Sequence, residues 1–147
     1  MAVTVAAVRQ AASTAVDAVP GTSVSRYAAD LFGRDVRTLV HKSFSVDTPG
    51  TRVLAEAGPE RQMRTEGALV ETDVRIQVAH RCQVEAMVSN YDDALGFESD
   101  VIKAVKAASA SGGIRWIYSS STREVTAAGE FYFITINFRA VHQLALA

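Results

Sequence analysis

The sequence predicts an α+β fold: an antiparallel or mixed sheet of about four to five strands, two main helices packed on one face, and a long inter-strand loop. Three observations predict this class. Apolar residues recur at three- and four-residue steps in two segments, they alternate with polar residues in others, and the segments run helix, strand, loop, strand, helix, strand, strand. The 147 residues fit one domain, 1–147, that is long enough to bury a core.

The first helix is expected over residues 2–18. Its apolar stripe consists of Val5, Val8, Ala12, Ala15, Val16 and Val19. Pro20 and Gly21 end it, because the residue before a proline avoids the helical conformation. Arg9 and Asp17 interrupt the apolar run, and no basic stretch precedes it. We therefore interpret the segment as an amphipathic helix rather than a signal peptide or a membrane span.

A short helical piece at residues 25–32 is expected to precede the first strand, which the period of two predicts over residues 36–46. Residues 47–67 then hold two of the three prolines, three glycines and charges of both signs. This composition predicts a long loop, or arm, that joins two antiparallel strands. Residues 68–81, ALVETDVRIQVAHR, give the clearest strand, with one apolar face and one charged face that begins at Glu71.

The second main helix is predicted over residues 90–109, with Asn90 as its cap and Asp92 and Asp93 near its positive end. An alternative start is Ser99. The buried stripe of this helix is expected to consist of Phe97, Val101, Val105 and Ala108.

Two further strands are predicted at residues 114–121 and 129–144, with a turn at residues 120–124 between them. The last strand has Tyr132, Ile134, Ile136, Phe138 and Ala140 on one face, and Phe131, Phe133 and Val141 on the other. Because both faces carry apolar side chains, we expect cover on both: a helix on one side and another element or subunit on the other.

The charge balance disfavours one class of function. The net charge is −1 and the pI is about 6.3, whereas proteins that live on nucleic acid need a surplus of Lys and Arg on one face. A ring with a locally charged lumen remains compatible with these values. The single cysteine, Cys82, allows no intrachain disulfide and indicates a reducing compartment.

The spacing of potentially reactive residues predicts no catalytic, metal-binding or cofactor-binding residue. His41, His80 and His142 lie far apart and show none of the HxxxH, HxH or CxxC spacings. We interpret Cys82 as a small apolar residue near a strand end, and Asp92 as a helix-end residue. No phosphate loop or nucleophile elbow occurs. The chain is expected not to be an enzyme and to need no cofactor.

Four stretches together resemble a known family. They are the N-terminal helix, RTLVHKSFSV with the loop that follows it, GALVETDVRIQVAHR leading to NYDDAL and VIKAV, and the closing IRWIYSSSTREVTAAGEFYFITINFRA. In order and kind they resemble the tail terminator proteins of long-tailed bacteriophages and gene transfer agents, over most of the chain. The resemblance rests on the arrangement of elements rather than on a residue signature.

The resemblance implies a non-enzymatic virion protein at the head–tail joint, present in the host cytoplasm during assembly. Such a protein forms a hexameric ring that caps the tail tube, ends tube growth and provides the head–tail joining surface. The implied partners are copies of the chain itself, the tail tube protein and a head–tail connector protein. No membrane and no sequence-specific nucleic acid is implied, and DNA passing through the ring lumen is compatible with the role.

Mixed charges on the predicted arm and on the charged strand face suggest an oligomer interface, because paired charges fix register and orientation between subunits. The candidate interface residues are Arg52, Glu56, Glu60, Arg61, Arg64, Glu66, Glu71, Asp73 and Arg75. Another head–tail connector, tail-completion or tail-tube subunit stays open as an alternative, and a small α+β enzyme or ligand-binding domain is a more distant one.

Overall fold

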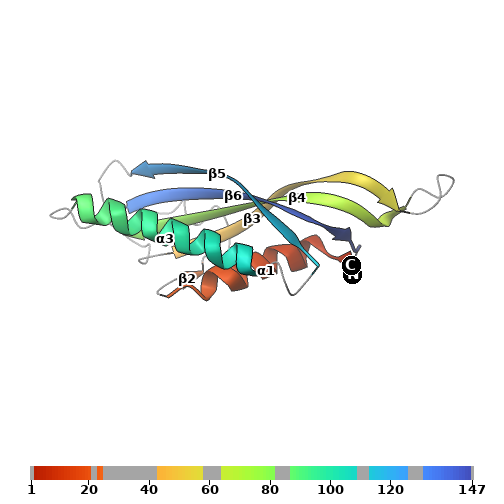
Figure 1. Ribbon diagram of the computed structural model, residues 1–147, viewed down its shortest axis with the longest axis horizontal. Coiled ribbons are helices and arrows are strands. Elements are labelled where there is room, and N and C mark those ends of the chain that lie inside the picture. The colour runs from red at the N-terminus through yellow and green to blue at the C-terminus, as the bar shows by residue number, and fades with distance from the viewer. Residues whose placement is uncertain are drawn as a thin grey trace.

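The computed structural model describes residues 2–20, 23–24, 43–57, 64–81, 87–108, 113–125 and 131–146. In chain order the elements are β1 (Ala2–Val3), α1 (Val5–Asp17), β2 (Ser23–Val24), β3 (Ser43–Ala57), β4 (Arg64–Arg81), α3 (Met87–Ala107), β5 (Arg115–Val125) and β6 (Phe131–Leu144). Within these ranges two helices pack against a curled, mixed sheet (Figure 1), so the predicted α+β class is confirmed.

The strands follow the order β1-β6-β4-β3-β2, and β5 also pairs with β6. The long strands β3, β4, β5 and β6 pair antiparallel, while the two short strands β1 and β2 pair parallel to β6 and β3. The first residue of β5, Arg115, lies opposite Val141, and Ala2 of β1 lies opposite Gln143. Therefore β1 continues the sheet where β5 leaves it.

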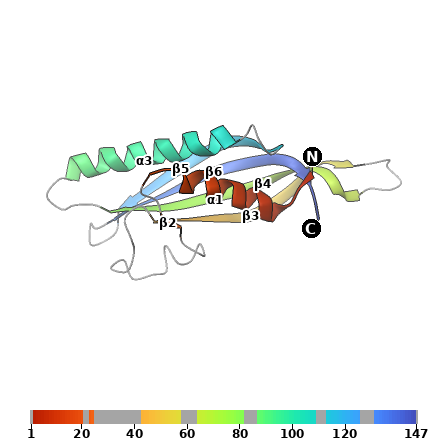
Figure 2. The same cartoon turned by 90° about the horizontal axis from the view of Figure 1, so that it is seen from below.

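Both helices pack against the same face of the sheet, as the sequence predicted, and Figure 2 shows α3 running along the sheet and α1 in front of its strands. Strand side chains alternate between faces, so the even-numbered residues of β4 and β6 point at the helices. The core that they form contains Val8, Ala12 and Val16 of α1, Phe97, Val101 and Val105 of α3, Val74, Ile76 and Val78 of β4, and Ile134, Ile136 and Phe138 of β6. Burying each larger apolar side chain stabilises the fold by about 1.5–3 kcal/mol.

The start of the first helix differs from the prediction. Residues 2–3 are a strand, and α1 begins only at Val5 because Thr4 caps it. The Oγ1 atom of Thr4 accepts a hydrogen bond from the backbone N–H of Ala7 at 3.0 Å, which satisfies one of the free donors of the first turn.

The prediction of a loop over residues 47–67 was wrong for most of that interval. β3 runs to Ala57 and β4 begins at Arg64, and the two strands pair along this length. The turn-like composition reflects a bulge: Asp47 lies opposite Arg75 while Gly50 lies opposite Asp73, so β3 takes one extra residue. Pro49 sits in that bulge, where its missing N–H interrupts no regular pairing.

Two further boundaries also differ. The predicted turn at residues 120–124 is strand, because β5 continues to Val125 in register with β6. The helix α3 begins at Met87, so neither Asn90 nor Ser99 starts it, and the exposed Asp92 and Asp93 lie beyond its first turn. The predicted helical piece at residues 25–32 and the strand residues 36–42 lie outside the described residues.

One part of the sheet projects beyond the rest. The last pair between β4 and β6 is Leu69 with Gln143, and past it β3 and β4 pair only with each other among the described residues. We call residues 53–57 of β3 and 64–69 of β4 the ribbon. Its base, with Val53 and Leu69, still lies beside the end of β6, and the rest extends past both helices at the right of Figure 1. Gly67 allows the backbone there a φ of 80°, in the left-handed region that side chains with a Cβ disfavour.

Candidate functional site

The sheet face opposite the helices carries four of the charged side chains that the sequence singled out, and we call it the polar face. β4 contributes its odd-numbered residues Glu71, Asp73 and Arg75, and β6 contributes Asn137 and Arg139 directly across from Arg75 and Asp73. The candidates Glu71, Asp73 and Arg75 of β4 therefore share one face, as their alternation predicted.

Two bulges bring further side chains to this face. The bulge in β3 shifts its alternation by one, so that the even-numbered Arg52 lies opposite Glu71. The irregularity in β5 between Tyr118 and Ser120 does the same and places Ser120 opposite Asn137. The same shift turns Arg123 of β5 toward the helix side, where it contacts Glu98 of α3.

An ion-pair network links three strands on the polar face. Arg52 bonds both Glu71 and Asp73, and its Nη1 and Nη2 atoms lie 3.2 and 3.1 Å from the two carboxylate oxygens of Asp73. Arg75 donates to Asp47 at 2.8 Å. The hydrogen bond to Asp73, followed by that to Glu71, raises the pKa of Arg52, so this guanidinium stays charged at any pH of interest.

Arg139 is held less tightly than its neighbours. Its Nη1 atom lies 3.7 Å from the Oε1 atom of Glu71, beyond hydrogen-bond distance, and Glu71 is already bonded to Arg52. The Nε atoms of Arg75 and Arg139 are both buried and have no hydrogen-bond partner within the described ranges. These two arginines thus have donor capacity that the network does not use.

A hollow of about 350 Å³ lies in the polar face. Its charged lining consists of Arg52, Arg75, Arg139 and Asp73, and its polar lining includes Ser119, Ser120 and Asn137. The carboxylates of Asp47 and Glu71 belong to the network but do not line the hollow. The wall therefore presents three cations against one anion, and one of those cations is already paired with that anion.

The structure brings only part of the predicted interface set together. Arg52, Glu71, Asp73 and Arg75 meet on the polar face, where Glu71 is largely buried. Glu66 lies on the exposed ribbon, and its Oε2 atom accepts a hydrogen bond from the backbone N–H of Leu146 at 2.7 Å. Of the remaining candidates, Glu56 and Arg64 belong to the ribbon strands, where the structure describes their backbone only. Glu60 and Arg61 lie outside the described residues.

Sequence reasoning did not assign Arg139, Asn137 or Asp47 to the site. Alternation along the last strand could have grouped Asn137 with Arg139, since they lie two residues apart. Their meeting with Arg75 and Asp73 depends on the register between β4 and β6, which local pattern does not specify.

The histidines that the structure describes do not form a site. His80 and His142 lie at opposite ends of the β4–β6 pairing, opposite Tyr132 and Val70 respectively. Both are buried: the Nε2 atom of His142 lies 2.9 Å from the Oγ1 atom of Thr72, and His80 lies beside Phe97 with 6.0 Å between ring centroids. The structure describes neither His41 nor the side chain of Cys82. In the described part of the chain, no three His, Cys, Asp or Glu residues are grouped so as to hold a metal ion.

Two other surface features complete the description. A second hollow, of about 470 Å³, runs between α1 and α3 and is lined mainly by alanines, including Ala11, Ala15, Ala104 and Ala107. Neither α1 nor α3, as described, is both long and apolar enough to cross a membrane.

Comparison with known proteins gives a distant likeness among the solved structures. No protein family and no curated protein sequence matches the chain. Among solved structures, the chain is similar to a chain of one described as "Virion of native gene transfer agent (GTA) particle", with 15% sequence identity and a TM-score of 0.47. The similarity covers 92% of this chain and 93% of that chain. A likeness at this level does not assign a role to the present protein.

Proposed function

We propose that this chain is a structural protein of a phage-like particle, which joins copies of itself into a ring through the ribbon. The finer part of the proposal is that the ring is a tail terminator: it caps the tail tube, ends tube growth and provides the head–tail joining surface. The order of elements from which the family resemblance was drawn supports this role. The observation that carries the proposal is the ribbon itself.

The ribbon has features of a segment that docks on another molecule. A two-stranded hairpin is marginally stable by itself in water, yet this one extends beyond the last strand and both helices (Figure 1). It also exposes apolar side chains: Val53 is 50% exposed, Leu54 49% and Leu69 38%. Covering the exposed half of such side chains is worth about 1 kcal/mol each.

That gain is small for one contact, because association costs several kcal/mol of lost translational and rotational freedom. A ring repeats the contact at every subunit and closes, so weak contacts become sufficient together. Because the ribbon lies at one end of the molecule, a copy that receives it elsewhere on its surface makes a head-to-tail contact, which is the kind of contact that builds rings.

The polar face is the proposed receiving surface. The arginine side chains of its ion pairs are 40–50% exposed, so charged side chains of a neighbouring subunit can form ion pairs with them. Such pairs would fix the position and orientation of the neighbouring subunit. In this proposal Arg52, Glu71, Asp73 and Arg75 act on the receiving side, and Glu56, Arg64 and Glu66 act on the ribbon side. Glu60 and Arg61, between the two ribbon strands in sequence, belong to the same proposed interface.

The first experiment removes the apolar character of the ribbon without changing its strand propensity. The triple variant Val53→Thr, Leu54→Thr, Leu69→Thr keeps strand-compatible residues at all three positions. We expect it to keep the far-UV spectrum and thermal midpoint of the parent chain but to remain monomeric in sedimentation velocity, while the parent forms a discrete ring. The matched control is Lys103→Gln with Lys106→Gln, two exposed positions on α3. Ring formation by the triple variant at the same concentration as the parent would refute the ribbon contact.

A second experiment separates the terminator from its relatives in assembly. Negative-stain images of the purified parent chain are expected to show single rings, and caps at tube ends when the cognate tail tube protein is added. Long tubes formed by the chain alone would instead support a tail-tube subunit. Rings that bind connector complexes but never tube ends would support a head–tail connector.

A further inference from the structure

We propose that the hollow in the polar face is a binding site for a phosphate-class oxyanion, with Arg75 and Arg139 as its principal ligands. The proposal rests on the geometry of the hollow alone and does not depend on ring assembly. Its ligand is identified by chemistry: a tetrahedral, negatively charged oxyanion of the phosphate class, either free or as a phosphate group of a larger molecule.

Two arginines of the hollow have their carboxylate partners outside it. Arg52 and Asp73 line the hollow together and neutralise each other through two hydrogen bonds. Arg75 shares its charge with Asp47, which does not line the hollow. Arg139 has its closest described carboxylate oxygen at 3.7 Å, on a residue already bonded to Arg52. Hence Arg75 and Arg139 are the two cations of the wall whose carboxylate partners lie outside the hollow.

Arg75 and Arg139 are spaced so that both side chains can reach one anion. Arg75 lies directly opposite Asn137, and Arg139 is two residues further along the same face of β6. Such diagonal neighbours in an antiparallel pair have backbones about 7–8 Å apart, a separation that two long side chains can close upon one anion. The guanidinium group presents paired N–H donors whose planar geometry matches phosphate oxygens, so two of them can hold one phosphate.

Arg75 and Arg139 also carry hydrogen-bond donors that the network does not use. The Nε–H groups of Arg75 and Arg139 are buried and have no acceptor within the described ranges, which is uncommon for charged donors. Their side chains are 40% and 43% exposed, so each guanidinium has room to turn toward an acceptor in the hollow. Nearby, Ser120 accepts a hydrogen bond from the Nδ2 atom of Asn137 at 3.2 Å, which leaves its own hydroxyl proton to donate to a ligand.

The test measures binding of inorganic phosphate, by isothermal titration calorimetry and by the rise in thermal midpoint, against sodium chloride of equal ionic strength. The parent chain is expected to bind phosphate and sulfate, which share shape and charge, and to show no comparable response to chloride. Arg139→Gln is expected to weaken phosphate binding by about tenfold or more, because one charge-assisted, two-pronged contact is lost. Arg139→Lys keeps the charge but loses the planar guanidinium group. We expect it to bind phosphate more weakly than the parent chain and more tightly than Arg139→Gln.

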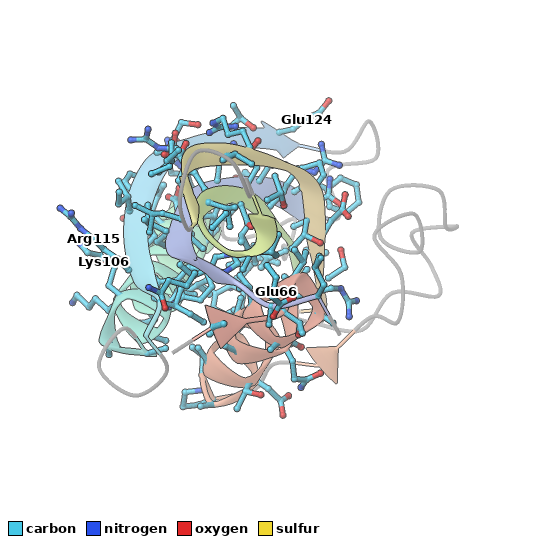
Figure 3. The ribbon with its side chains drawn as sticks, turned by 90° about the vertical axis from the view of Figure 1, so that its right-hand side faces the viewer. Glu66, Lys106, Arg115 and Glu124 are labelled. Atoms are coloured by element: carbon cyan, nitrogen blue, oxygen red, sulfur yellow. The ribbon has the colours of Figure 1, made fainter. Side chains whose placement is uncertain are left out.

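The matched control is Arg115→Gln. Arg115 is an exposed arginine that projects outward from the start of β5 (Figure 3) and does not line the hollow. Binding that is absent in the parent, or equally reduced by Arg115→Gln and Arg139→Gln, would overturn the proposal.

A further titration, with an oligonucleotide, identifies the source of the phosphate. Tighter binding of a short single-stranded oligonucleotide than of inorganic phosphate, lost in Arg139→Gln, assigns the site to phosphodiesters. The reverse order assigns it to free phosphate.

Discussion

The contact between Glu98 of α3 and Arg123 of β5 makes the sharpest prediction about stability. Arg123 donates to both carboxylate oxygens, with N–O distances of 2.9, 3.1 and 2.7 Å. The Glu98 side chain is 5% exposed while that of Arg123 is 40% exposed. The carboxylate of Glu98 is therefore buried while the guanidinium of Arg123 is partly exposed to solvent. The pair holds α3 against β5, the edge strand of the sheet.

The perturbation is Arg123→Gln, which leaves the buried carboxylate of Glu98 without its cation. Breaking a fully buried pair costs about 3–5 kcal/mol, and hydrogen bonds to a charged group are worth about 1.5–3 kcal/mol. Because water reaches Arg123, the lower figures apply, and we expect the free energy of unfolding to fall by about 2 kcal/mol. For a chain of this size that corresponds to a fall in thermal midpoint of about 4–8 °C.

The partner change Glu98→Gln is expected to cost less, about 1 kcal/mol, because the neutral amide oxygen can still accept from Arg123 and no uncompensated charge is left buried. In the double variant the orphaned charge is gone, so it is expected to be more stable than Arg123→Gln alone. The hydrogen bonds to Glu98 raise the pKa of Arg123, so the guanidinium remains charged and the effect is expected to be constant across neutral and mildly alkaline pH.

The assay is urea unfolding of the parent, both single variants and the double variant, with Arg115→Gln as the control for loss of an exposed arginine. A coupling energy below about 0.5 kcal/mol would refute the reasoning, because the two residues would then act independently. A double variant less stable than Arg123→Gln would contradict it as well.

Three further substitutions test the core, a buried hydrogen bond and a helix. Ile76→Ala is expected to lower the free energy of unfolding by about 3 kcal/mol, since the side chain is fully buried in the main cluster; a loss under about 1 kcal/mol in urea unfolding would show a loosely packed core. Thr72→Val removes the hydroxyl that lies 2.9 Å from the Nε2 atom of the buried His142, and calorimetry should show a loss of about 1–3 kcal/mol. Gly96→Ala should instead stabilise by about 0.5–1 kcal/mol, because Gly96 is an exposed residue inside α3 and an added Cβ would meet no atom within 4 Å; a lower thermal midpoint would contradict this account.

The helices and the clearest strand were predictable because their signal is local. The stripes that include Val8 and Val16, and Val101 and Val105, follow the helical period, and these residues are buried as expected. The alternation over residues 68–81 likewise gave the two faces of β4. In each case one buried face imposes a repeating pattern that a short window of sequence can reveal.

The bulges, the strand residues near them and the hollow could not be predicted, because they depend on pairing between residues that are distant in sequence. The stretch around Pro49 was interpreted as loop because its composition is that of a bulge, while the strand around it is stabilised by β4. Arg123 fell in a predicted turn for the same reason, since the shift in β5 is visible only against β6. The hollow is lined by residues of four strands, and its arginines come together because of the register between those strands. Alternation along one strand predicts which face a side chain lies on, but it does not predict which residue of the next strand lies beside it.

The pairing of Ala2 with Gln143 has a practical consequence for handling the protein. It sets the two described ends of the chain side by side, and the bond from Leu146 to Glu66 holds one of them against the base of the ribbon (Figures 1 and 3). In the proposed ring, a bulky fusion partner at either of these ends would therefore lie next to the ribbon and keep subunits apart. If the linker contained a protease site, cleavage would remove the fusion partner. The monomers would then all begin to assemble at the same chosen time.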